Sequence, residues 1–102
     1  MRKEALEAVV YDLIDLQTGM VVGQVTGAGD VISGDAQVTE RVTHAFAREV
    51  MVRDGELVEE LGICFANVET LYPGQPGHEA AVLRYLGKLS GYLPQVRDAD
   101  GP

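Results

Sequence analysis

The sequence predicts a single α+β domain, in which a small antiparallel sheet packs against two main amphipathic helices. Its length of 102 residues is that of one domain. Its hydrophobic share of 46% and charged share of 24% are typical of a folded globular protein. Two helical and about four strand-like segments occur in an order that favours a sheet with helices on its faces. We place the domain at 1–96 and expect 97–102 to form a flexible polar tail.

The first segment is predicted to be mainly a β-hairpin. Lys3–Leu16 has apolar residues at helical spacing, but it is also rich in β-prone residues. Gln17-Thr18-Gly19 then separates it from a second apolar run, and a short connection that ends in Gly is a hairpin signal. We therefore favour a short helix near 2–7, followed by strands at Val9–Leu16 and Met20–Thr26.

An alternative interpretation keeps the whole of Lys3–Leu16 helical. In that case the hairpin moves to Val21–Thr26 and Val31–Ser33, around the flexible sequence Gly27-Ala28-Gly29-Asp30.

The second helix is predicted to begin at Asp35 and to end at Asp54-Gly55. The short carboxylate of Asp35 can accept hydrogen bonds from the first free N–H groups of a helix. Glycine at residue 55 can take the left-handed conformation that closes helices. The apolar stripe of this helix consists of Val38, Val42, Ala45, Phe46 and Val50.

Strands are predicted between Glu56 and Tyr72. Leu57 and Val58 open the first strand, and Leu61–Leu71 forms either two short strands or one bent strand. The Pro- and Gly-rich sequence 73–77 cannot continue a sheet.

The last helix is predicted to begin near Pro76 and to stop at Pro94. Proline is suited to a helix start and breaks a helix interior. Gly87 and Gly91 lie four residues apart, and either they permit close approach of a neighbouring helix or their cost in the helix is simply tolerated. The apolar stripe consists of Val82, Tyr85, Leu86, Leu89 and Leu93.

The charge balance argues against nucleic acid and membranes as partners. Sixteen Asp and Glu face eight Lys and Arg, so the net charge is -8, whereas phosphate groups and anionic lipids need cations. The single cysteine, the lack of an apolar run of membrane-spanning length and the acidic N-terminal sequence predict a cytoplasmic protein.

No catalytic, cofactor or metal motif is evident, so we expect neither an enzyme nor a bound cofactor. Phosphate-loop and nucleophile-elbow sequences are missing, and His44, His78 and Cys64 lack the spacing of a zinc site. His78, at the start of the last helix, is expected at the surface. If a ligand binds between sheet and helix, the candidate polar groups are Tyr11, His44, Cys64 and Tyr72.

Two stretches resemble the roadblock/LC7 group of small dimerising domains. They are the hairpin Val9–Thr26, around Gln17-Thr18-Gly19, and the closing helix, His78–Leu86. The resemblance implies a layered sandwich that profilin-like folds share. It also implies edge-to-edge pairing of two copies into a continuous sheet, and a role as scaffold or as regulator of a small GTPase.

The leading hypothesis is therefore a non-enzymatic, homodimeric interaction domain. One alternative is an acidic inhibitor or antitoxin-like binder of a basic protein, and another is a small ligand-binding domain or enzyme. The candidate interface residues are Val82, Tyr85, Leu86, Leu89, Tyr92 and Met51.

Overall fold

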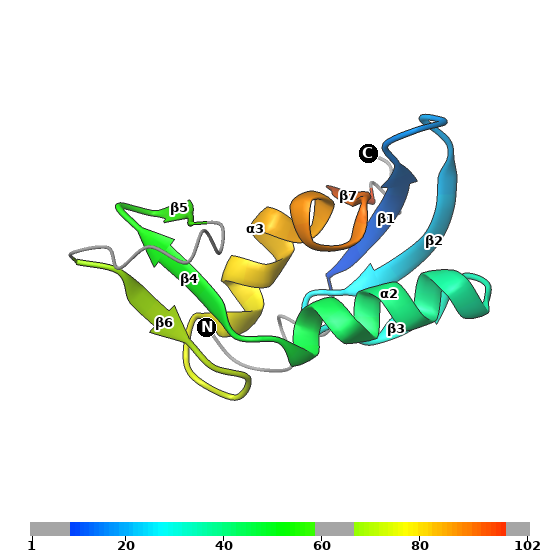
Figure 1. Cartoon of the computed structure of the whole chain (residues 1–102). Coiled ribbons are helices and arrows are strands. Elements are labelled where there is room, and N and C mark those ends of the chain that lie inside the picture. The colour runs from blue at the N-terminus through cyan, green and yellow to red at the C-terminus, as the bar shows by residue number, and fades with distance from the viewer. Residues whose placement is uncertain (1–8, 59–66, 98–102) are drawn as a thin grey trace.

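The computed structural model describes residues 9–58 and 67–97, which form an α+β structure as predicted (Figure 1). Two antiparallel sheets are present instead of the one expected, with strand orders β3-β2-β1-β7 and β5-β4-β6. In chain order the elements are β1 (Val10–Asp15), β2 (Val21–Thr26), β3 (Val31–Ser33), α2 (Ala36–Ala47), β4 (Val50–Arg53), β5 (Glu56–Leu57), β6 (Glu69–Leu71), α3 (His78–Ser90) and β7 (Tyr92–Val96).

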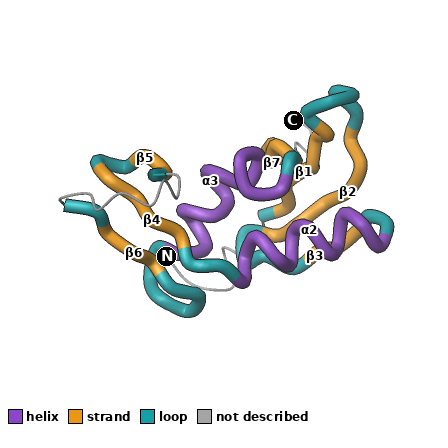
Figure 2. Tube along the Cα trace, in the orientation of Figure 1, coloured by secondary structure: helices purple, strands orange, loops and turns teal. Residues whose placement is uncertain are grey.

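The two sheets lie at opposite ends of the molecule, and α3 runs between them (Figures 1 and 2). Helix α2 comes directly after β3 in the chain, and it packs against α3 and β3. The four-stranded sheet therefore has one face toward the helices and another face turned away from them.

The favoured interpretation of the first segment is confirmed, because residues 10–15 form a strand and not a helix. Strands β1 and β2 pair antiparallel, and Gly19 takes a left-handed φ of 74° in the turn between them. The second hairpin, which we expected only as an alternative, also forms, since β2 pairs with β3. The short helix proposed near 2–7 lies outside the described residues.

Helix α2 begins as predicted but ends earlier. The backbone N–H of Val38 donates to Asp35 Oδ1 over 2.9 Å, which confirms the cap. The helix stops at Ala47, and Val50 begins strand β4 instead of extending the helical stripe. Asp54 and Gly55, with φ of 53° and 77°, form the tight turn between β4 and β5 instead of a helix end. This positive-φ pair suits a two-residue hairpin, and the sheet pairing overrides the helical spacing.

Within the described residues, three strands separate the helices, and the first of them, β4, lies where the sequence predicted helix. Strand β4 pairs with β5 on one side and with β6 on the other. The predicted strand at Leu57 is present in β5, and the end of the predicted Leu61–Leu71 region forms β6. Residues 59–66 of that region lie outside the described part.

Helix α3 ends at Ser90, with Gly91 as its C-cap, before the predicted stop at Pro94. Gly91 has φ 88°, and its N–H donates to the Gly87 carbonyl, so the chain leaves the helix three residues early. The chain continues as β7, which pairs with β1 and tolerates Pro94 because β7 is an edge strand. Gly87 approaches β7 rather than a helix: a Cβ there would lie 3.9 Å from the Leu93 Cα.

Strand β7 ends at Val96, the last residue of the predicted domain. The N–H of Arg97, the first residue of the predicted tail, still donates to the Val10 carbonyl over 2.9 Å. Residues 98–102 lie outside the described part of the chain.

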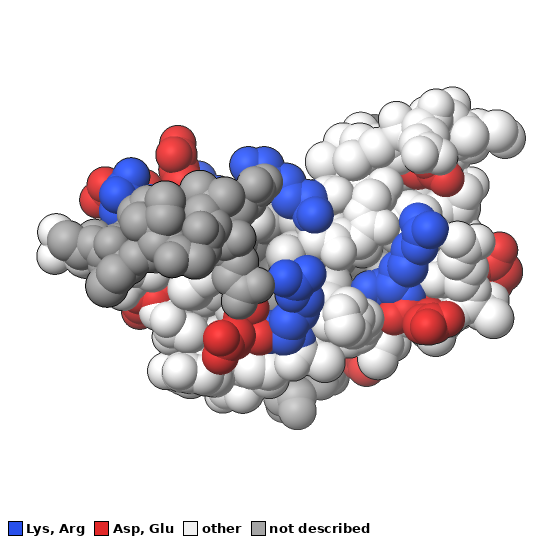
Figure 3. Space-filling model, viewed as in Figure 1, with Lys and Arg blue, Asp and Glu red and all other residues white. Residues whose placement is uncertain are grey.

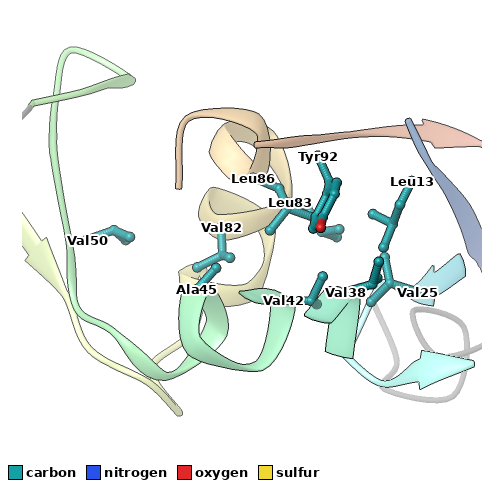
Figure 4. Packing of buried hydrophobic residues seen from close by; sticks show 10 residues of the cluster. All are labelled: Leu13, Val25, Val38, Val42, Ala45, Val50, Val82, Leu83, Leu86 and Tyr92. Carbon is teal, nitrogen blue, oxygen red and sulfur yellow. The ribbon is translucent and has the colours of Figure 1, made fainter. Parts of the chain in front are cut away.

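The hydrophobic core lies where α2 and α3 meet the inner face of the four-stranded sheet (Figure 4). Leu13 and Val25 come from the sheet, and both are fully buried. The remaining buried members are Val38, Val42, Ala45, Val50, Val82, Leu83, Leu86 and Tyr92. Most residues of the two predicted helical stripes therefore pack within the chain itself.

Candidate functional site

An apolar row crosses the face of the four-stranded sheet that is turned away from the helices. Leu13 points into the core, so its neighbour Ile14 points to the other face, because side chains alternate along a strand. Ile14 lies opposite Val21 on β2 and opposite Leu93 on β7. We call Val21, Ile14 and Leu93 the outer row. Val21 is 53% exposed and Leu93 46% exposed, while Ile14 is half-buried.

A polar row runs beside the outer row on the same face. Asp12 lies opposite Gln24 on β2 and opposite Gln95 on β7. The Gln24 side-chain amide donates to Asp12 Oδ1 over 3.3 Å. The face therefore consists of an apolar row beside two neutral amides and a single carboxylate.

Most of the exposed large hydrophobic side chains of the described chain belong to this sheet. Seven such side chains are exposed, and only Tyr72 lies away from the sheet and its bordering loops. The other six are Leu16, Met20, Val21, Ile32, Leu93 and Val96. Apolar side chains that gather on one element mark interaction surfaces better than scattered ones do.

The four strands of this sheet contain no basic residue, and the arginine nearest to them in the described chain is Arg97, which directly follows β7. Basic side chains gather instead over the middle of the molecule, where the helices lie (Figure 3). The upper right of that view, where the β1–β2 hairpin projects, shows none (Figure 3). Interface cores are typically depleted of charge, so the outer face has the composition of a contact surface.

The sequence-based interface residues are only partly available for contact. Val82, Leu86 and Tyr92 are buried in the chain's own core, so this part of the prediction is corrected. The helical stripe is apolar because it packs against the sheet and α2. Tyr85, Leu89 and Met51 are half-buried. Met51 and Leu89 line a hollow of about 200 Å³ between α3, β4 and β5.

The candidate polar groups are not brought together by the fold. Tyr11, on β1, lines a hollow between α3 and β7, whereas His44 lines another hollow, between α2 and α3. Tyr72 is exposed next to β6, in the other sheet. Cys64 lies outside the described residues. The described members of this set therefore do not form one site.

His78 was expected at the surface, but it is buried, with 1% of its area exposed. Its Nε2–H donates to the Arg48 carbonyl over 2.9 Å and so ties the start of α3 to the connection between α2 and β4. A signal was present in the sequence: His78 lies four residues before Val82 and so continues the buried stripe of α3.

The described residues show neither a metal-binding cluster nor a membrane-spanning helix. Residues 9–58 and 67–97 contain no cluster of three or more His, Cys, Asp or Glu side chains that could hold a metal ion. Within the same residues, neither helix has the length and apolar character needed to cross a membrane.

Comparisons with family models, curated proteins and solved structures find no match to this chain.

Proposed function

We propose that this chain is a non-enzymatic, homodimeric protein-interaction domain whose copies pack through the outer face of the four-stranded sheet. The observation that carries the proposal is the outer row, in which Val21, Ile14 and Leu93 form an apolar line across three neighbouring strands. Removing such surface from water provides the main driving force for protein association.

A second copy of this chain is the partner that we propose for this face, because an apolar row can pack against an identical apolar row. In a two-fold dimer each copy presents the same patch, so the outer row of one chain can lie against the outer row of the other. The amides of Gln24 and Gln95 then border the contact and can hydrogen-bond across it or to water. The carboxylate of Asp12 already accepts a hydrogen bond from Gln24, which lowers the cost of placing it near the interface.

Pairing of sheet edges, which the roadblock/LC7 resemblance implies, is less well supported than packing of faces. Among the residues that the structure describes, the edge strands are β3, β7, β5 and β6, with three, five, two and three residues. The longest of them, β7, carries Pro94, which has no N–H to donate to a partner strand. Short edges and edge prolines are common devices against edge pairing.

Sedimentation equilibrium or light scattering at tens of micromolar protein tests the proposal. The natural chain is expected to have the mass of a dimer, and Val21→Lys is expected to give a monomer. A charge placed within an apolar contact must be desolvated without a partner, which strongly disfavours association.

Tyr72→Lys is the matched control, because Tyr72 is also 53% exposed but lies next to β6 in the other sheet. It is expected to remain dimeric. A natural chain that stays monomeric at this concentration, or a dimer that survives Val21→Lys, contradicts the proposal.

A further inference from the structure

A groove runs between α3 and the edge strand β7. It consists of two hollows, of about 350 and 470 Å³, which share Arg84 and Leu93 in their walls. Tyr11 and Leu83 contribute apolar surface at one end, and Leu16 contributes it at the other. We call this feature the α3–β7 groove.

Gly87 shapes the end of the groove near Leu16. A Cβ at this position would lie 3.4 Å from Leu16 Cδ1 and 3.9 Å from the Leu93 Cα. Because glycine has no side chain, the helix backbone comes close to β7 there, and apolar surface stays open beside it.

The charges that line the groove have one sign. Arg84 and Lys88 lie one helical turn apart on α3, and both are exposed. None of the described residues that line the two hollows is Asp or Glu, although the chain has sixteen acidic residues and only eight basic ones. A third hollow, across Arg84 beside Val52 and Leu71, likewise has no acidic side chain among its described lining residues.

We infer that the α3–β7 groove binds a segment of another protein that carries both acidic and apolar side chains. The apolar walls favour apolar side chains of the segment, and Arg84 with Lys88 favours carboxylates beside them. The two hollows follow each other along α3, and Ala80 to Lys88 spans about 12 Å of helix at 1.5 Å per residue. A row of shallow hollows of this length matches a polypeptide segment better than a single compact small molecule.

This inference goes beyond the proposed dimer, since the dimer contact is the outer face of the sheet and the groove lies along α3. Leu93 borders both surfaces. The variants that test the two ideas therefore avoid Leu93 and use Arg84 for the groove and Val21 for the dimer.

Fluorescence anisotropy with labelled synthetic peptides of about 14 residues tests the inference. One peptide carries Leu at helical spacing and Glu at the flanking positions; the other carries Lys in place of Glu. The Leu/Glu peptide is expected to bind at least about tenfold more tightly than the Leu/Lys peptide, and to weaken between about 50 and 500 mM salt, because exposed charges are screened. Equal affinities, or no binding of the Leu/Glu peptide up to about 1 mM, overturn the inference.

The role of Arg84 in the groove is tested with Arg84→Glu, which is expected to lower the affinity for the Leu/Glu peptide by about tenfold or more. Arg41→Glu is the matched control, because Arg41 is also an exposed arginine on a helix. Both arginines lie over a tyrosine ring: the Arg41 Cζ is 5.6 Å from the centre of the Tyr92 ring, and the Arg84 Cζ is 5.8 Å from the centre of the Tyr85 ring. Arg41→Glu is expected to bind like the natural chain. Equal losses in the two variants overturn the assignment to this groove.

The same peptide is also measured against Val21→Lys, and the mass of Arg84→Glu is determined by light scattering. Peptide binding by Val21→Lys at natural affinity, together with a dimeric Arg84→Glu, supports two separate surfaces. Loss of peptide binding in Val21→Lys overturns the inference that the groove and the dimer contact are separate surfaces. A monomeric natural chain that still binds the Leu/Glu peptide contradicts only the proposed dimer.

Discussion

Replacing Gly23 with alanine is expected to destabilise the protein, although alanine is normally the better residue for stability. Gly23 lies in the middle of β2 and is buried. A Cβ there would lie 2.4 Å from the carbonyl oxygen of Ser33 and 3.2 Å from Val38 Cγ1. The first of these neighbours is backbone, so it cannot move away without shifting β3 against β2.

Two effects of opposite sign set the magnitude. Loss of glycine's freedom in the unfolded chain stabilises the alanine variant by about 0.4 to 1 kcal/mol. Relief of the close contact with Ser33 requires a backbone shift, and overpacking of this kind costs about 1 to 3 kcal/mol or more. The contact is about 1 Å shorter than an ordinary carbon–oxygen contact. We therefore expect the upper part of the range and a net loss of about 1 to 2 kcal/mol in the free energy of unfolding.

Urea denaturation and thermal melting followed by circular dichroism measure the effect. A loss of this size lowers the melting temperature by about 4 to 16 °C in a domain of this length. Gly87→Ala is the comparison, because Gly87 lies in helix α3 and an added Cβ there would make only an ordinary contact, 3.4 Å from Leu16 Cδ1. Since glycine costs about 1 kcal/mol in a helix interior, Gly87→Ala is expected to stabilise the chain. A Gly23→Ala variant as stable as the natural chain would show that the contact between its Cβ and the Ser33 carbonyl oxygen is relieved at no cost.

Three further substitutions test the core, a helix cap and the buried histidine. Leu86→Ala removes a fully buried side chain and is expected to cost about 2 to 5 kcal/mol, measured as a lower urea midpoint. Asp35→Ala removes the acceptor for the Val38 N–H; a loss of about 0.5 to 2 kcal/mol is expected, and a loss no larger than that of Asp35→Asn would argue against the cap. His78→Leu leaves the Arg48 carbonyl without its donor and is expected to cost about 1 to 3 kcal/mol, whereas an unchanged melting temperature would show that this bond contributes nothing.

Local signals in the sequence identified several elements correctly. Gln17-Thr18-Gly19 marked the β1–β2 turn because glycine tolerates the left-handed φ that Gly19 adopts. Asp35 marked the start of α2 because its carboxylate reaches the Val38 N–H. These signals act within a few residues of the chain, so one sequence is enough to detect them.

The ends of both helices were misplaced for a shared reason. Val50 fits the stripe of α2 and Leu93 fits the stripe of α3, but each lies in a strand. Helical spacing cannot show whether a β-prone residue has a strand partner elsewhere. For Val50 that partner is Leu71, and for Leu93 it is Ile14.

The outer row could not be found from the sequence because its members come from three distant strands. Val21, Ile14 and Leu93 become neighbours only through the register of β1 with β2 and with β7, including a register shift between Leu13 and Ile14. A one-residue change in register reverses the face to which a side chain points. The α3–β7 groove likewise depends on the strand that follows α3, where the sequence predicted more helix.

Local sequence patterns were sufficient to predict an α+β chain, the turn of its first hairpin and the start of α2, because turns and caps depend on neighbouring residues. The division of the strands into two sheets, the burial of His78 and the choice of exposed apolar residues became visible only in the folded chain. Those outcomes depend on pairing between residues far apart in the chain, and side-chain burial follows from that pairing.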